Sequence, residues 1–64
     1  MLLGIDVGGT HTDAVLIDEH KGIISKFKVK TDKNNLLDTV ITALREVTSG
    51  IDVKNIANVN LSTT

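Results

Sequence analysis

The first thirty residues consist of apolar runs separated by short polar turns. Residues 2–7 form a nearly continuous apolar run, which is typical of a strand covered on both faces. Residues 13–18 predict a second strand, and residues 23–30 predict a third in which apolar residues alternate with lysines, as at a guarded sheet edge. Because the turns at residues 8–12 and 19–22 are short, we expect the three strands to form antiparallel hairpins.

In the second half of the chain the apolar spacing becomes helical. Apolar residues recur every three or four positions over residues 36–47, which predicts one amphipathic helix. Asn35 is placed to cap its N-terminus, and Asp38 lies in the first turn, where the helix dipole favours a carboxylate. Gly50 fits the C′ position that ends the helix.

A short strand is expected after the helix. Asp52 is predicted to cap a single helical turn, and residues 59–62 predict a strand with Leu61 facing inward. This strand is most simply parallel to the first one. The expected fold class is therefore α/β, with three antiparallel strands, a helix and a parallel strand. Because α/β proteins place ligands at the carboxyl ends of parallel strands, a chain that stops there is expected to be incomplete.

Composition narrows the possible classes of protein. The chain has 64 residues, of which 41% are apolar, with a formal net charge of −1 and no cysteine. These values exclude several domains, a disulfide framework and a bulk attraction for nucleic acid. No apolar run approaches the roughly 20 residues of a membrane span, and the start does not resemble a secretory signal. We therefore expect a cytoplasmic protein with no nucleic-acid or membrane partner.

Small size also predicts a need for partners. Phe27 is the single aromatic residue, and a chain this short buries little apolar surface. We therefore expect residues 1–64 to be an amino-terminal fragment that packs against the rest of its own chain or a companion subunit. We also expect an oligomer.

The most informative stretch is residues 4–13, Gly-Ile-Asp-Val-Gly-Gly-Thr-His-Thr-Asp. Its adjacent glycines let a turn reach positive φ and leave no Cβ in front of the backbone N–H groups, which can then converge on an anion. The hydroxyl groups of Thr10 and Thr12 are expected to lie at the open side of the same turn. Asp6 ends an apolar strand, where a carboxylate could hold Mg²⁺, and an unpaired buried carboxylate would otherwise be costly. The residues alone leave two interpretations open, a phosphate-plus-metal loop and a plain tight hairpin.

Residues 4–13 resemble the first phosphate loop of the sugar kinase, heat-shock chaperone and actin superfamily. Within that loop, Gly-Gly-Thr-x-Thr-Asp at residues 8–13 is most similar to the hydantoinase and 5-oxoprolinase family. Residues 59–64, Val-Asn-Leu-Ser-Thr-Thr, resemble the strand and loop that follow the first helix of that family. The order of elements matches the start of the ribonuclease H-like core that these proteins share. Two departures are His11, where an aromatic residue is usual, and Leu-Ser at residues 61–62, where His-Gly is usual.

The resemblance implies ATP and Mg²⁺ as cofactors, and it assigns roles to residues at both motifs. Asp6 would orient the metal ion, and Asp13 would be a second acid near the metal or the substrate. The residues expected to bind the ATP phosphates are Gly8, Gly9, Thr10, His11 and Thr12. Of these, His11 is included because it lies at the open end of the loop. A substrate-side loop would begin with Ser62, Thr63 and Thr64.

The implied activity is the ATP-dependent opening of a cyclic amide of the hydantoin or 5-oxoproline type. The general base and the adenosine pocket would lie outside residues 1–64, so the isolated chain is expected to be inactive. A kinase of the same superfamily that phosphorylates a small metabolite is the first alternative. A non-catalytic actin-like ATPase or activator that uses nucleotide to change shape is the second.

Overall fold

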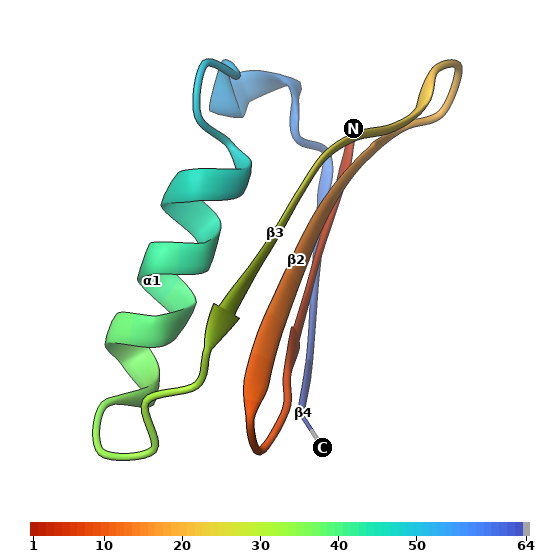
Figure 1. The fold of residues 1–64 in the computed structure, drawn as a ribbon. Coiled ribbons are helices and arrows are strands. Elements are labelled where there is room, and N and C mark those ends of the chain that lie inside the picture. The colour runs from red at the N-terminus through yellow and green to blue at the C-terminus, as the bar shows by residue number, and fades with distance from the viewer. Residues whose placement is uncertain (64) are drawn as a thin grey trace.

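A computed structural model describes residues 1–63 of the chain, and it has one sheet with one helix packed on it (Figure 1). The sheet order is β3-β2-β1-β4, in which β1 pairs antiparallel with β2 and parallel with β4, and β2 pairs antiparallel with β3. The predicted α/β class and the predicted directions of all four strands are confirmed. The elements are β1 Leu2–Val7, β2 His11–Asp18, β3 Gly22–Lys30, α1 Leu36–Val47, the 3₁₀ turn η1 Val53–Asn55 and β4 Asn58–Thr63.

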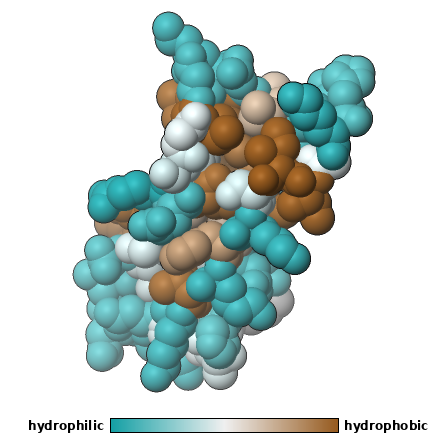
Figure 2. All heavy atoms as spheres, turned by 45° about the horizontal axis from the view of Figure 1, so that its top comes forward, coloured by the Kyte–Doolittle hydropathy of each residue, from teal (hydrophilic) through white to brown (hydrophobic). Residues whose placement is uncertain are grey.

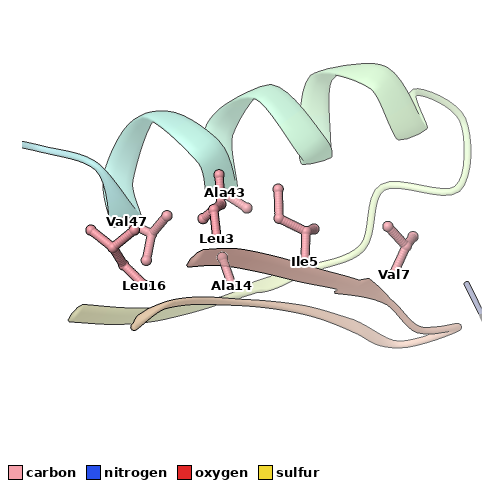
Figure 3. Close-up of a cluster of buried hydrophobic side chains, with 7 residues drawn as sticks. All are labelled: Leu3, Ile5, Val7, Ala14, Leu16, Ala43 and Val47. Carbon is pink, nitrogen blue, oxygen red and sulfur yellow. The ribbon is translucent and has the colours of Figure 1, made fainter. Parts of the chain in front are cut away.

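The core lies between α1 and one face of the sheet (Figure 3). In β1, buried and more exposed residues alternate, so only one face of this strand is covered. The prediction that β1 is covered on both faces is therefore wrong within the described residues. The buried apolar side chains come from β1, β2 and α1 and are Leu3, Ile5, Val7, Ala14, Leu16, Ala43 and Val47.

Both ends of α1 are set by side-chain hydrogen bonds. Asn35 caps the N-terminus as predicted, because its Oδ1 accepts from the Asp38 N–H at 3.1 Å. At the other end Thr48 is the cap residue, and its hydroxyl donates to the Leu44 carbonyl at 2.7 Å. Gly50 has a φ of +78° but lies two residues beyond Thr48, so the predicted C′ position is wrong by one residue. Its left-handed conformation turns the chain after the helix.

β4 is an edge strand that α1 does not cover. Asp52 caps η1 as predicted, because its side chain accepts from the Lys54 N–H at 3.0 Å, and the chain then pairs with β1. Leu61 lies opposite Ile5 and therefore faces the helix side of the sheet, yet it is 60% exposed. The prediction that Leu61 faces inward is wrong as to burial, because α1 packs on β1, β2 and β3 and makes no contact with β4 within the described residues.

Apolar side chains therefore reach the surface beside β4 and on the outer side of α1. Val59 is 62% exposed and Leu37 is 70% exposed. The space-filling view in Figure 2 shows that apolar areas interrupt the polar surface on the face it presents. Across residues 1–63, no helix is both long and apolar enough to pass through a membrane.

Candidate phosphate and metal site

The turn between β1 and β2 is closed by backbone hydrogen bonds. The Gly8 N–H donates to the His11 carbonyl at 3.0 Å, and the Thr31 N–H donates to the Thr10 carbonyl at 2.9 Å. Among the described residues the glycines with positive φ are elsewhere, at Gly22 and Gly50. The expectation that the turn uses positive φ is therefore wrong.

Gly9 nevertheless leaves open space in front of the turn. It is exposed, and a Cβ built on it would meet no protein atom within 4 Å. Neither its backbone conformation nor the packing around it therefore demands glycine. A ligand that approaches the backbone closely does favour a residue without a Cβ.

A chain of buried hydroxyl groups holds the turn from its helix side. The hydroxyl of Thr31 donates to the Gly8 carbonyl at 2.8 Å and lies 2.9 Å from the hydroxyl of Thr12. Because the Thr31 proton is used by Gly8, Thr12 is the donor of the second bond. Thr12 is fully buried, so its hydroxyl does not open to the mouth of the turn as the sequence suggested. Sequence reasoning missed Thr31, since nothing in the pattern distinguishes it from the polar link that follows.

The two carboxylates of the motif lie side by side on the other face of the sheet. Asp6 and Asp13 are directly opposed across β1 and β2, and both are exposed. Asp6 is therefore not a buried structural acid, since its alternate position in β1 faces away from α1. Opposed residues of an antiparallel pair have Cβ atoms about 5 Å apart, so the two charges repel unless neighbouring groups offset them.

Neighbouring strands supply those groups in the same register row. Ser62 in β4 is opposite Asp6, and its hydroxyl donates to Asp6 Oδ1 at 3.1 Å. Lys28 in β3 is opposite Asp13, and its Nζ lies 3.5 Å from Asp13 Oδ1. The row Ser62–Asp6–Asp13–Lys28 thus crosses all four strands, and sequence reasoning did not connect Lys28 with the motif.

The remaining predicted residues lie around the turn. Thr10 and His11 are exposed, and His11 Nδ1 lies 3.3 Å from the Thr10 hydroxyl. Thr63 lines a hollow of about 220 Å³ on the helix side of the turn, while Thr64 lies outside the described residues. The other residues that line the hollow are Val7, Gly8, Gly9, Thr31, Lys33 and Leu36. The turn, the start of α1 and the end of β4 lie at one end of the molecule (the lower end in Figure 1).

The oxygen donors present fit Mg²⁺ better than a transition metal. Residues 1–63 contain no group of three or more His, Cys, Asp or Glu side chains that could hold a metal ion. They do contain the opposed carboxylates of Asp6 and Asp13. Mg²⁺ is usually held by one or two carboxylates together with substrate phosphates and water, so this donor set is sufficient only when a phosphate ligand supplies the rest.

A solved structure shares this fold over nearly the whole chain. It is the crystal structure of a ROK family glucokinase from Streptomyces griseus in complex with glucose and AMPPNP. The sequences are 30% identical, the TM-score is 0.79, and the match covers 97% of this chain and 20% of the glucokinase. Among curated proteins, none matches this chain.

The fold and the glycine turn together define the class of protein. Three antiparallel strands, a helix and a parallel strand form the start of the ribonuclease H-like core of actin-like ATPases, the superfamily of that glucokinase. Residues 2–64 match the family model described as the hydantoinase/oxoprolinase N-terminal region. The chain belongs to the hydantoinase/oxoprolinase family, and the match lies in the N-terminal region of that family.

Proposed function

We propose that this chain is the amino-terminal phosphate-binding segment of an ATP-dependent hydrolase that opens a cyclic amide of the hydantoin or 5-oxoproline type. The family match over residues 2–64 is the observation that supports a hydrolase. The open space at Gly9, together with the opposed carboxylates of Asp6 and Asp13 on the two strands that the turn joins, supports a phosphate and metal site at this turn.

In this proposal the β1–β2 turn binds the ATP phosphates through its backbone. Gly9 and Thr10 would present backbone N–H groups and, at Thr10, a hydroxyl. Gly8 would help to shape the turn, because its N–H donates to the His11 carbonyl and its carbonyl accepts from Thr31, which Thr12 holds from inside. Asp6 would hold Mg²⁺, with Asp13 as the second acid. When bound, the ion would neutralise phosphate charge, which is the main requirement of phosphoryl transfer.

The chemistry that we propose uses ATP to activate the amide. The amide oxygen would attack the γ-phosphorus with loss of ADP, and water would add to the activated carbon. Collapse of this tetrahedral adduct would break the ring C–N bond, with a proton transferred to the leaving nitrogen, and a second water would hydrolyse the resulting acyl phosphate to carboxylate and free phosphate. Residues 1–63 would supply binding and charge in this scheme, with Ser62 and Thr63 on the substrate side.

A small-metabolite kinase is the second candidate, and the likeness to the glucokinase favours it. That protein was crystallised with glucose and AMPPNP, and this chain shares its fold at 30% identity. The two candidates differ in product. The hydrolase yields a ring-opened acid and free phosphate, whereas the kinase yields a phosphorylated metabolite.

We further propose that the exposed apolar side chains of Val59 and Leu61 on β4, and of Leu37 on α1, pack against later segments of the same polypeptide. The exposure of these side chains supports a covering element, and the chain spans only 20% of the length of the glucokinase that it matches. A companion subunit on the same surface is the alternative outcome of the test given below.

Nucleotide binding by the full-length protein tests the proposed function. We expect Asp6→Asn to weaken Mg-ATP binding by more than about tenfold, because charge-assisted contacts to the metal are lost. Glu46→Gln, which removes an exposed carboxylate from α1, is the matched control and should leave the affinity unchanged. Equal affinity in wild type and Asp6→Asn would remove Asp6 from the site.

Mass spectrometry of reactions with hydantoin, 5-oxoproline and glucose then separates the two candidate products.

A further inference from the structure

Lys28 stands out among the lysines of the edge strand β3. Lys26, Lys28 and Lys30 all lie on the sheet face away from α1, where lysines commonly guard an edge against further pairing. Lys28 differs because it forms the one ion pair found within residues 1–63, and its partner is Asp13 of the proposed site. Edge protection alone does not account for this placement.

The ion pair is too exposed to contribute much to stability. The side chains of Lys28 and Asp13 are 65% and 53% exposed, and pairs of this kind stabilise a fold weakly. Its effect on local charge is larger, because Asp6 and Asp13 face each other directly. With Lys28 in place, the row from β4 to β3 carries a net charge of −1 rather than −2.

We infer that Lys28 is a positioning residue for the nucleotide and metal, an inference that rests on the proposed function. By neutralising Asp13, Lys28 leaves Asp6 as the carboxylate that carries the net charge of the row. A row with one net negative charge attracts a divalent cation yet repels the triphosphate weakly. A row with two net charges would hold the cation more tightly and exclude the triphosphate more strongly.

Removal of Lys28 should therefore shift two affinities in opposite directions. In full-length protein at low salt, we expect Lys28→Met to weaken ATP binding in EDTA by roughly threefold to tenfold and to tighten Mn²⁺ binding by a similar factor. Mn²⁺, measured by electron paramagnetic resonance without nucleotide, serves as the probe for Mg²⁺. ATP binding is measured by calorimetry. Both changes in affinity should become smaller at about 0.5 M salt, because dissolved ions then screen the interaction between charges that lie more than a few ångströms apart.

Two variants control for net charge and for structure. Lys21→Met removes the same charge from the turn between β2 and β3, roughly 17 Å along the strands from Asp13, and should leave both affinities unchanged. Lys28→Arg keeps the charge and should restore both affinities. A structural defect would instead weaken both affinities together.

The outcomes separate this inference from the proposed function. Parallel weakening, or no change, in Lys28→Met overturns the role of Lys28. If Asp6→Asn weakens Mn²⁺ binding in the same assay while Lys28→Met changes nothing, the inference alone is wrong. If Asp6→Asn also leaves both affinities unchanged, the proposed function fails as well.

Discussion

The hydroxyl groups of Thr12 and Thr31 lie 2.9 Å apart in the interior, where they join the second strand to the residue that follows the third. Thr31 in turn donates to the Gly8 carbonyl at 2.8 Å. The glycine turn is thus fixed from below by two side chains that are 19 positions apart in sequence. This arrangement gives the turn a defined shape before any ligand binds.

The direction of these hydrogen bonds predicts unequal costs for two isosteric substitutions. Thr12→Val removes one hydrogen-bond donor and leaves no other buried donor without an acceptor. We therefore expect a loss of about 0.5–1.5 kcal/mol in the free energy of unfolding. Thr31→Val leaves the buried Thr12 hydroxyl and the Gly8 carbonyl without their partner, so we expect a loss of about 2–3 kcal/mol. Urea denaturation of the full-length protein measures both. Equal losses would contradict the assigned donor directions.

Gly9 should tolerate a methyl group structurally but not functionally. Gly9→Ala meets open space and needs no positive φ, so stability should change by less than about 0.5 kcal/mol. Nucleotide affinity should fall roughly tenfold, because the new Cβ occupies the space proposed for the phosphates.

Gly22→Ala is the matched control for Gly9→Ala, with the opposite pattern. Gly22 has a φ of +81°, so alanine there should cost about 1 kcal/mol of stability and leave nucleotide affinity unchanged. Thermal denaturation and nucleotide titration of both variants distinguish the two glycines. Unchanged nucleotide affinity in Gly9→Ala would show that the space in front of the turn serves no ligand.

Asp18 should make the β2–β3 turn sensitive to acid. Its carboxylate accepts from the backbone N–H groups of His20 at 2.8 Å and Lys21 at 3.2 Å, and these bonds lower the pKa of Asp18 below its ordinary value of 3.8. Because the folded-state pKa is the lower one, the stabilisation is present above pH 3.8 and is lost as pH falls through the folded-state pKa.

The matching experiment compares wild type with Asp18→Ala at several pH values. We expect the variant to melt at a lower temperature at pH 7 and the difference to narrow below pH 3.8. Chemical-shift titration of the Asp18 carboxyl gives the pKa directly. A melting difference that stays constant from pH 7 to pH 2 would mean that the charge of Asp18 does not contribute to the turn.

Leu61 tests whether the exposed apolar surface is covered in the full-length protein. If it is, Leu61→Ala should cost about 2–4 kcal/mol, as core leucines do. Asn60→Ala, next to it on the opposite sheet face, is the control and should cost less. A cost below about 0.5 kcal/mol for Leu61→Ala would mean that this surface stays exposed. A cost that depends on protein concentration would assign the cover to another subunit.

Local patterns were enough to predict the elements of this fold. Apolar spacing located α1, and Asn35 and Asp52 marked the starts of α1 and η1, because capping depends on residues only a few positions apart. Strand directions also followed from short turns and from the helix that precedes β4. The contiguous motif at residues 4–13 was enough to predict the family that the match over residues 2–64 shows.

Tertiary structure decided which residues of that motif are exposed and which are buried. Asp6 is exposed, whereas Thr12 is buried and does not open to the mouth of the turn as the sequence suggested, because strand alternation assigns them to opposite faces and only one face is covered by α1. Thr31 and Lys28 joined the site through pairing across β1, β2 and β3. Such pairing depends on register between distant segments, which no local pattern in the sequence specifies.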